Sequence, residues 1–558
     1  MVLERFLPRI EFDSYEDFKK NYTVNVPENF NFGFDIVDAW AKEDKNKRAL
    51  VWCNDFNEEH IFTFDDISRL SNKVANYFKS LGLKKGSVVM LILRRRWEYW
   101  ICAVALIKMG IIVIPGTDQL TKKDIAYRAE AANIEAFVCR DDDYVVSQVE
   151  LAKAETPCIK HLILANGKRE GWVNLHEEID KFSDELTRPT GEEATKNTDI
   201  MQIYFTSGTT GMPKMVCHNY MHPLGHIVTA KYWQRVQENK LHMSVSESGW
   251  AKFGWGKIYG QWICGATIFA YDMEKLVAHN FLETIQKYKL TTFCAPPTIY
   301  RMLLQEKVED YDLSSIEQFC TAGEALDFAS CTRWEEITGH RIASGFGQTE
   351  GTVLLADFQW FEPKPGALGK PSPIYNLQLR NAEGKECENG EEGEICIADV
   401  DTNPPVGLFV GYYKNPEQTK EALGSGVYNL KDVAWRDNYG YYWFVGRHDD
   451  VIKCSGYRIG PFEVESALKL HPAVVESAIT AAPDPIRGQV VKATIVLAKG
   501  YEPSPELIKE LQNHVKRTTA PYKYPRIVEF VNELPKTIGG KIKRAEIRSE
   551  DAKKHTEN

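Results

Sequence analysis

The stretch Thr206-Ser-Gly-Thr-Thr-Gly-Met-Pro-Lys214 directly follows an apolar, strand-like run, Gln202 to Phe205. Its two glycines permit a tight loop, and its N–H groups and hydroxyls can surround phosphate oxygens. Lys214 adds a flexible positive charge for the outer phosphates. The common nucleotide-loop pattern GxxxxGK[ST] does not fit, because a proline precedes the lysine and the glycines lie too close together. The stretch predicts a phosphate-binding loop of a different kind, with a plain surface loop as the alternative.

On both sides of this loop, strand and helix patterns alternate. Before it we expect a helix at Phe64 to Ser80, a strand at Val88 to Leu93, a helix at Tyr99 to Met109 and a strand at Ile111 to Ile114. Around and after it we expect strands at Gln202 to Phe205, Ala266 to Phe269, Thr292 to Cys294 and Gln318 to Thr321. This rhythm is typical of parallel sheets covered on both faces by helices, so the sequence predicts an α/β fold.

The pattern changes towards the C-terminus. Ile374 to Ala398 reads as short strands and turns, which predicts a small β-rich subdomain within the large domain. A sharper change at Gly446 to Asp450 predicts a domain boundary, with a large N-terminal domain at 1–448 and a small, mobile α+β domain at 449–558. In the small domain we expect helices at Phe462 to Leu470 and Ser504 to Arg517, strands at Val474 to Thr480 and Lys492 to Leu497, a hairpin at Pro535 to Lys543, and a frayed tail from Ser549 to Asn558.

Composition excludes several classes of protein. A chain of 558 residues is too long for one hydrophobic core, and a net charge of -10 argues against general nucleic-acid binding. The apolar stretch Trp100 to Pro115 contains Lys108 and is too short to span a bilayer, so no integral membrane association is expected. The start, Met1 to Ile10, resembles neither a secretory nor a transit signal. Twelve cysteines without CxxC pairs indicate reduced, mostly buried thiols and no structural zinc, as in a cytoplasmic protein.

Five further motifs follow the phosphate loop in order: Gly345-Phe-Gly-Gln-Thr-Glu350, Tyr428-Asn-Leu-Lys-Asp432, Gly446-Arg-His-Asp-Asp450, Gly456-Tyr-Arg-Ile459 and Pro535-Lys-Thr-Ile-Gly-Gly-Lys541. Together the six motifs resemble the adenylate-forming (AMP-binding) superfamily, which contains acyl-CoA synthetases, luciferases and peptide-synthetase adenylation domains. The resemblance covers nearly the whole chain. The runs at 453–465 and 519–526 look like those of medium-chain acyl-CoA synthetases.

The resemblance implies an ATP-dependent, AMP-forming carboxylic acid–CoA ligase of fatty acid metabolism, with ATP, Mg²⁺ and coenzyme A. A carboxylate attacks the α-phosphate of ATP and expels pyrophosphate, and a thiol then attacks the acyl carbon and expels AMP. The first step joins two anions, so positive charge and magnesium must offset their repulsion. The sequence leaves open whether the enzyme is a monomer or a homodimer.

For the nucleotide, the resemblance implies that Glu350 binds magnesium and that Thr349 contacts the α-phosphate. Catalysis is assigned to Lys541, Thr349, Glu350 and Lys214. The ATP-binding set is Thr206, Ser207, Gly208, Thr209, Thr210, Gly211, Lys214, Gly323, Glu324, Ala325, Gly345, Phe346, Gly347, Gln348, Thr349, Asp432, Arg447 and Lys541. In this set Asp432 and Arg447 reach the ribose, and Gly323 to Ala325 line the adenine. The sequence departs from the family at Lys431, where most relatives have glycine, and at Gly540, which replaces serine or threonine.

For the thioester step, the resemblance implies rotation of the small domain about a hinge at Asp449, which withdraws Lys541. Coenzyme A should then meet Ser455, Gly456, Tyr457, Arg458, Arg487, Lys516, Tyr524, Pro525 and Arg526. In this group Gly456 leaves room for the pantetheine arm, and Tyr524 with Pro525 forms a stacking ledge for adenine. No cysteine is needed as a nucleophile, because coenzyme A brings its own thiol.

The acyl pocket is expected at Gln119, Trp250, Trp255 and Gly347. Acetate-specific relatives carry tryptophan at the position of Gly347, so glycine implies a deeper cavity for medium-chain, branched or aromatic acids. The aromatic residues are alternatively plain core.

Two other functions stay open at this point. One is an adenylating enzyme with a different acceptor, such as a carrier protein. The other is a non-catalytic nucleotide-binding sensor, which the joint retention of Lys541, Glu350, Asp432 and Arg447 disfavours.

Overall fold

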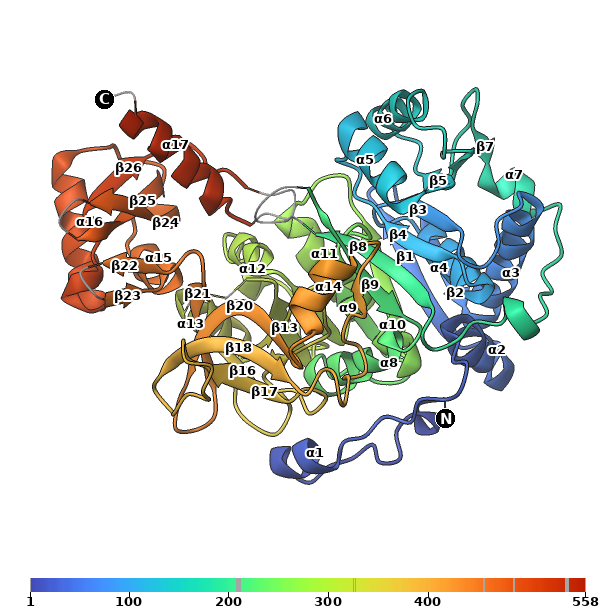
Figure 1. Cartoon of the computed structure of the whole chain (residues 1–558), viewed down its shortest axis with the longest axis horizontal. Helices are drawn as coiled ribbons and strands as arrows, with labels where there is room; N and C mark the ends of the chain where they lie inside the picture. Colours follow the sequence, from blue (N-terminus) through green and yellow to red (C-terminus); the bar gives the residue numbers. More distant parts are fainter. Residues whose placement is uncertain are drawn as a thin grey trace.

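The computed structural model describes residues 2–206, 212–324, 326, 328–454, 457–484, 487–536 and 541–556. The described strands form three sheets, two in the large N-terminal part and one in a smaller C-terminal unit (Figure 1). Both predicted parallel sheets are present, and the fold is α/β as expected from the alternating pattern.

The first sheet has the strand order β19-β9-β8-β4-β3-β5-β6-β7. At one edge lie β19 (Gly411–Tyr412), β9 (Lys214–Asn219) and β8 (Ile200–Thr206), and at the other lies β7 (Val173–Asn174). Its parallel centre is β3 (Val88–Ile92), β4 (Ile112–Pro115), β5 (Ala136–Cys139) and β6 (His161–Leu164). Two helices show how the sequence determines the helical segments of this part of the chain. Helix α3 (Phe64–Ser80) begins at a capping box between Thr63 and Asp66, and α4 (Glu98–Met109) is buried on almost every side because its sequence is almost entirely apolar.

The second sheet joins the predicted parallel strands to the predicted β-rich subdomain. Its parallel part is β1 (Arg48–Asn54), β11 (Thr267–Asp272), β10 (Leu241–Ser244), β12 (Thr292–Ala295), β13 (Gln318–Ala322) and β14 (Ile342–Phe346). It continues through the antiparallel strands β15 (Leu355–Ala356), β16 (Ala367–Pro371), β21 (Tyr442–Arg447), β20 (Val427–Arg436), β18 (Glu392–Ala398) and β17 (Leu377–Arg380). The continuous sheet brings the Gly345 to Glu350 motif, which begins in the last two residues of β14, near the motifs of β20 and β21.

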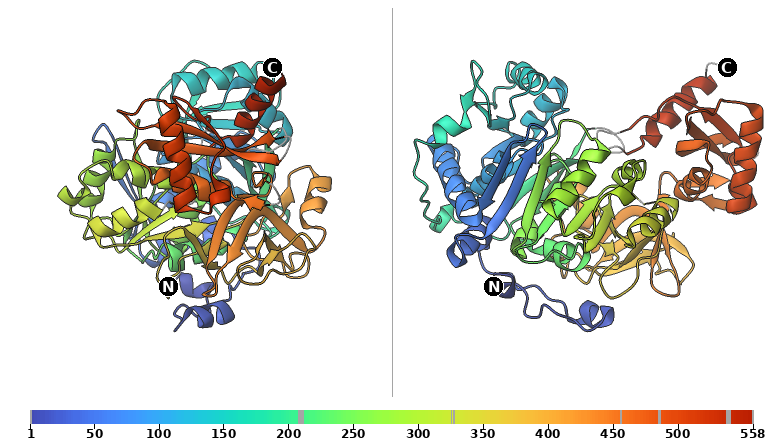
Figure 2. Two further views of the ribbon diagram at one scale, coloured as in Figure 1. Left: turned by 90° about the vertical axis from the view of Figure 1, so that its left-hand side faces the viewer. Right: turned by 180° about the vertical axis from the view of Figure 1, so that it is seen from behind.

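The C-terminal unit has its own sheet and its own hydrophobic core. It contains β22 (Ile452–Cys454), β23 (Tyr457–Ile459), β24 (Val474–Asp484), β25 (Gly488–Leu497) and β26 (Ile527–Phe530), with α15 (Pro461–Lys469), α16 (Pro505–Thr518) and α17 (Arg544–Thr556). Helix α17 points its N-terminal end towards the large domain (Figures 1 and 2). The position of the domain boundary, between 448 and 449, stays a prediction.

The expectation of a frayed tail from Ser549 is wrong, because α17 extends to Thr556. Two contacts hold the helix against the sheet. Asp551 is buried and forms an ion pair with Lys492 of β25, and Ile547 packs against Ala478 and Leu534. The polar sequence of the tail predicted fraying. The residues that hold α17 in place, such as Lys492 and Ala478, lie far from it in the chain and could not be identified from the sequence of the tail.

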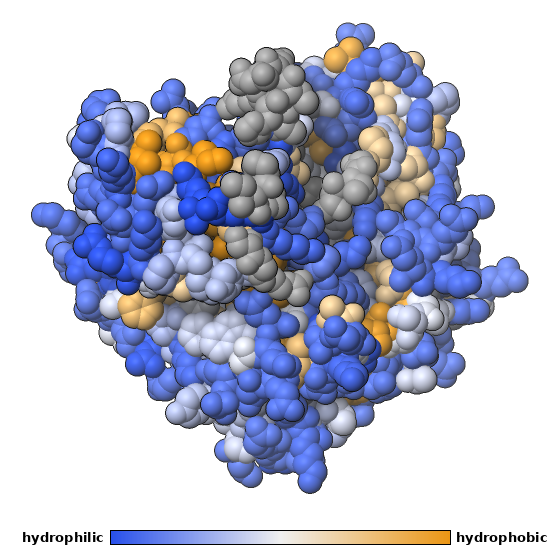
Figure 3. All heavy atoms as spheres, turned by 60° about the vertical axis from the view of Figure 1, so that its left-hand side comes forward, coloured by the Kyte–Doolittle hydropathy of each residue, from blue (hydrophilic) through white to orange (hydrophobic). Residues whose placement is uncertain are grey.

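Every cysteine except Cys158 is buried, which agrees with the thiol character expected from the sequence. Within the described ranges, no helix is long and apolar enough to cross a bilayer. The face turned forward in Figure 3 is mainly hydrophilic, with hydrophobic residues gathered in a few small areas.

Candidate active site

The predicted phosphate loop connects two antiparallel strands. Strands β8 (Ile200–Thr206) and β9 (Lys214–Asn219) pair antiparallel, and Thr206 lies opposite Lys214 at the base of the loop. The predicted ligands Ser207, Gly208, Thr209, Thr210 and Gly211 lie outside the described residues. The ammonium of Lys214 lies 5.1 Å from the centre of the Tyr412 ring. The lysine thus faces the site that also contains Glu350.

Glu350 lies just beyond the carboxyl end of β14. The Tyr412 hydroxyl donates to Glu350 Oε1 at 3.3 Å, and the Phe409 amide donates to the Glu350 carbonyl at 2.7 Å. Burial raises the pKa of Glu350, while the Tyr412 hydroxyl and the charges of Lys214 and Arg447 oppose that shift. One oriented carboxylate fits a magnesium ion that is held mainly by ATP phosphates and water. In the part of the chain that the structure describes, no group of three or more acidic, histidine or cysteine side chains forms a separate metal site.

Three buried histidines, His218, His222 and His226, form a histidine string beside the segment that carries Thr349 and Glu350. His218 Nε2 lies 2.8 Å from the Thr349 carbonyl and His222 Nδ1 lies 3.1 Å from the Gly407 carbonyl, so both nitrogens carry protons. His222 Nε2 must therefore accept from His226 Nε2 at 3.1 Å. Burial lowers the pKa of His218 to about 4 and that of His226 to about 3, so the string is neutral at physiological pH. The sequence analysis did not predict this histidine string, because His218 lies on β9 and only His222 and His226 lie on α8 (His222–Ile227).

The two predicted ribose residues come together on neighbouring strands. Asp432 of β20 lies opposite Arg447 of β21, with Arg447 Nε 3.7 Å from Asp432 Oδ1. Gln348 donates to Asp432 Oδ2 at 2.5 Å, and the Tyr428 hydroxyl donates to Gln348 Oε1 at 3.1 Å. Burial raises the pKa of Asp432 to about 6, against the opposing effects of Arg447 and Gln348.

The departure at Lys431 has a structural meaning. Lys431 has a φ of 60°, a left-handed conformation that glycine adopts without strain. Its carbonyl accepts a hydrogen bond from the His448 amide at 2.9 Å, which ties it to the segment beside Arg447. The lysine therefore keeps the backbone that a glycine would take, and Asp432 keeps its place.

Lys541 lies within electrostatic range of this centre. Its charge lowers the pKa of both Asp432 and Lys252, two residues of the large domain. The neighbouring Gly540 lies outside the described residues. In this structure the charge of Lys541, in the C-terminal unit, therefore acts on Lys252 and on Asp432, which is a predicted ribose ligand.

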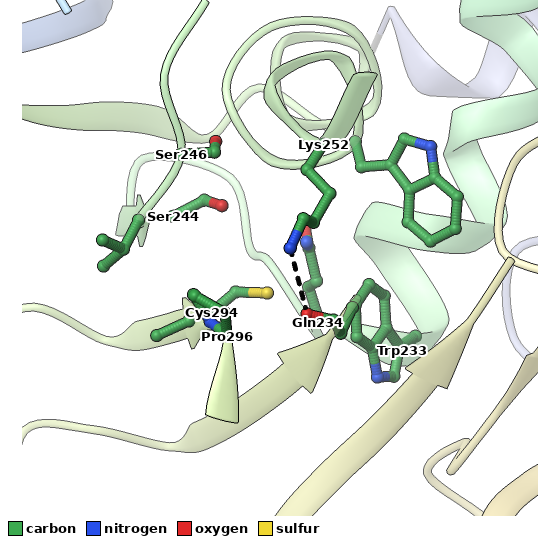
Figure 4. Close-up of a pocket in the computed structure, with 11 residues that line it drawn as sticks. Trp233, Gln234, Ser244, Ser246, Lys252, Cys294 and Pro296 are labelled. Carbon is green, nitrogen blue, oxygen red and sulfur yellow. Dashed lines mark hydrogen bonds between the residues drawn. The ribbon is translucent and has the colours of Figure 1, made fainter. Parts of the chain in front are cut away.

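A small pocket of about 10 Å³ lies beside Ala322, which directly precedes Gly323. Figure 4 shows the side chains that line it. It is lined by Trp233, Gln234, Ser244, Val245, Ser246, Lys252, Trp255, Cys294, Ala295, Pro296 and Ala322. Lys252 donates to the Ala322 carbonyl at 3.4 Å, and burial is the main cause that lowers its pKa to about 8. Sequence reasoning gave Lys252 no role, because a lysine among aromatic and glycine residues has no distinctive spacing.

Of the four predicted pocket residues, only Trp255 is among the described lining. Gln119 is exposed, and Trp250 is partly buried but outside that lining. The prediction that Gly347 leaves room for a deeper cavity stays a prediction, because in this structure the space beside the glycine is occupied. A Cβ at this position would lie 2.4 Å from Trp255 Cη2 and 2.5 Å from the Thr352 carbonyl oxygen. The indole of Trp255 fills the space that the glycine leaves.

Gly323, in the predicted adenine segment, also makes a close approach to a side chain of the pocket, as Gly347 does to Trp255. A Cβ there would lie 2.1 Å from the ammonium of Lys252, and its φ of 102° also favours glycine. Its neighbour Glu324 raises the pKa of Lys252 by its charge, against the dominant effect of burial, and Ala325 lies outside the described residues. Both glycines therefore bring nucleotide motifs into close contact with walls of the pocket.

The predicted coenzyme A residues are only partly described. Ser455, Gly456 and the side chain of Arg458 lie outside the described part, and Arg487 pairs with Asp484 at the turn between β24 and β25. Lys516 and Arg526 do lie together, 4.1 Å and 4.8 Å from the centre of the Tyr524 ring. The ring that was expected to stack on adenine therefore already carries two cations. Tyr457 instead stacks on Tyr522, with 4.2 Å between ring centres.

The fold and this arrangement of nucleotide residues define an adenylate-forming enzyme. The model of the AMP-binding enzyme family matches residues 37–413, and that of the AMP-binding enzyme C-terminal domain matches residues 463–541. The chain belongs to the AMP-binding enzyme family.

Its relatives are similar over nearly their whole length. The human mitochondrial acyl-coenzyme A synthetase ACSM3 is 41% identical over 551 residues, which are 97% of this chain and 93% of that protein. Human mitochondrial ACSM4 is 41% identical over 537 residues, covering 94% and 91%. Among solved structures, the anthranilate CoA ligase AuaEII in complex with anthranoyl-AMP has 29% identity and a TM-score of 0.86, covering 95% of this chain and 99% of that one. The Brucella canis acyl-CoA synthetase has 27% identity and a TM-score of 0.74, covering 98% and 100%.

Proposed function

We propose that the protein is an ATP-dependent, AMP-forming carboxylic acid–CoA ligase. One observation carries the proposal most strongly: the buried pocket and the nucleotide motifs share walls. Lys252 lies against Gly323, and Trp255 lies against Gly347. An acid in this pocket and an ATP on these motifs would meet with carboxylate and α-phosphate adjacent, as adenylate formation requires.

In the first step, Lys214 and Lys541 supply positive charge where the carboxylate and the phosphates meet. Glu350 would hold magnesium, which offsets the phosphate charge when it is bound with ATP. Thr349 contacts the α-phosphate, and Asp432 and Arg447 hold the ribose. The neutral His218 fixes the Thr349 carbonyl and so orients the segment that carries Glu350.

In the second step, the C-terminal domain (449–558) rotates about Asp449 on the N-terminal domain (1–448) and withdraws Lys541. The Lys516, Tyr524 and Arg526 cluster then serves the phosphates of coenzyme A, whose thiol attacks the acyl carbon. For adenine to stack on Tyr524, one of the two cations must leave the ring, and both would be drawn towards phosphate.

The substrate is a medium-chain, branched or aromatic acid. Because the pocket has a volume of only about 10 Å³ in this structure, the acyl chain must displace the Trp255 indole, which therefore sets the depth of the pocket. A pyrophosphate-release screen across C2 to C10, branched and aromatic acids tests this. Each acid is assayed with and without free coenzyme A, because turnover with free coenzyme A alone excludes an obligatory carrier-protein acceptor. Release that no acid stimulates would reject the ligase function.

Location and assembly belong to the proposal as well. We place the protein in the cytoplasm, although the curated relatives carry the word mitochondrial in their names. Cell fractionation distinguishes the two compartments. Light scattering distinguishes a monomer from a homodimer.

A further inference from the structure

Lys541 stands at the end of a hairpin and just before a helix. The hairpin closes through a bridge between Lys536 and Ile542, and the Lys543 amide donates to the Pro535 carbonyl at 2.8 Å. Helix α17 begins at Arg544, three residues after Lys541. Contacts that hold the first turn of α17 in place therefore also determine the position of the Lys541 backbone.

The first turn of α17 is fixed by a buried ion pair. Arg544 Nη2 lies 2.7 Å from Glu465 Oε1 and 2.8 Å from Oε2, and Arg544 Nε adds a contact of 3.3 Å to Oε1. The Glu465 side chain is only 5% exposed, and its Oε1 also accepts from the Ile479 amide at 2.8 Å. This single carboxylate joins α15, β24 and α17. A multidentate arginine pair of this kind sets geometry as well as energy.

The same face of α17 also reaches the predicted hinge. Arg548, one helical turn after Arg544, hydrogen-bonds to Asp450, and Arg544 Nη1 lies 3.9 Å from Asp450 Oδ2. Asp450 directly follows Asp449, and its side chain is mostly buried. Along the chain, the hinge and Lys541 are separated by the entire C-terminal sheet, whereas the ion pair of Asp450 with Arg544 connects the segments that carry them through two side chains.

We propose that Glu465, Arg544, Arg548 and Asp450 form a positioning network, the α17 clamp, which holds Lys541 in a fixed relation to the hinge. The inference rests on the proposed function. With the clamp intact, one rotation at Asp449 places Lys541 at the carboxylate and α-phosphate. Without it, the hinge still turns but the lysine arrives out of register, so adenylation suffers and the thioester step does not.

The test measures the two half-reactions separately on the full-length protein. Single-turnover pyrophosphate release from ATP and acid reports adenylation, and formation of acyl-CoA from pre-formed acyl-adenylate reports the second step. In Glu465→Gln we expect adenylation to fall by about ten- to a hundredfold, because misplacement by about 1 Å can cost that much. The thioester step should change less than about threefold by the same reasoning. Arg544→Lys keeps the positive charge but loses the planar guanidinium that contacts both oxygens of Glu465. We therefore expect adenylation to fall less than in Glu465→Gln.

The chain offers a matched control. Glu463, also on α15, pairs with Lys523 at 2.5 Å and has no place in the clamp. Glu463→Gln removes an ion pair from the same helix, so we expect both half-reactions to keep their rates. The thermal unfolding midpoint of each variant shows whether the fold survives. If Glu465→Gln does not fold, Arg548→Gln breaks the Asp450 contact at a partly exposed position and should still lower adenylation selectively.

Equal loss of both half-reactions in the folded variants would overturn the clamp and leave a structural ion pair. Unchanged adenylation would overturn it as well. Lys541→Ala is measured beside them, and normal adenylation in that variant would remove the residue that the clamp is meant to position. Wild-type protein that releases no pyrophosphate with any acid would instead overturn the proposed function itself, which separates the two failures.

Discussion

Replacing Trp255 with alanine should change which acids the enzyme prefers. The indole fills the space beside Gly347 and forms a wall of a pocket of about 10 Å³, which is room for about one water molecule. Removing the indole opens depth for a longer acyl chain. Each further methylene buried there should contribute about 0.8 kcal/mol, or roughly a fourfold gain in kcat/KM. Over three methylenes this is about 2.4 kcal/mol, or roughly a 60-fold shift in preference.

The assay is the ratio of kcat/KM for octanoate to that for pentanoate, measured by pyrophosphate release. A ratio is necessary because losing a buried tryptophan commonly costs about 3–5 kcal/mol of folding free energy, and a general defect cancels in a ratio. Gly347→Trp is the counterpart. Because the new side chain would meet Trp255 and the Thr352 carbonyl, it should damage every acid alike and leave the ratio unchanged. An unchanged ratio in Trp255→Ala, or a reversed chain-length preference in Gly347→Trp, would refute this reasoning.

Three other outcomes are expected. Lys541→Ala should lower adenylation by about 10²- to 10³-fold and largely spare acyl-CoA formation from pre-made acyl-adenylate, as two half-reaction assays would show. Asp449→Pro fixes φ at one value, so adenylation should survive while turnover with coenzyme A collapses; near-normal steady-state turnover would exclude Asp449 as the pivot. Burial raises the pKa of Asp432 to about 6, so its carboxylate becomes protonated as the pH falls through 6. The KM for ATP should therefore rise below pH 6. In Asp432→Asn the KM for ATP should be high at every pH, because the titrating carboxylate is absent.

Much of the fold followed from local patterns. The helix Phe64–Ser80 has the predicted bounds because a capping box and helical apolar spacing agree, and the parallel strands are short apolar runs between such helices. The tail could not be predicted in the same way. Its helix depends on the contact between Asp551 and Lys492, which only the folded sheet creates.

The motifs predict which residues bind the nucleotide, but they do not give the distances in space between segments that lie far apart in the chain. Whether Gly347 opens a cavity depends on where α9 (Ala251–Gly256) places the Trp255 indole, and no local pattern reports that. The histidine string was missed for the same reason. Its protonation pattern is set by the carbonyls of Thr349 and Gly407, which lie 131 and 185 residues from their histidine partners.

The central claim is that one site first joins an acid to AMP and then transfers it to a thiol. A stepwise product assay tests it most directly: the enzyme is mixed with ATP, magnesium and an acid from the screen, and coenzyme A is added later. We predict an acid-dependent burst of pyrophosphate before coenzyme A is present, followed on its addition by one AMP and one acyl-CoA for each acid consumed. Formation of ADP and phosphate, or a pyrophosphate burst that no acid affects, would contradict the account.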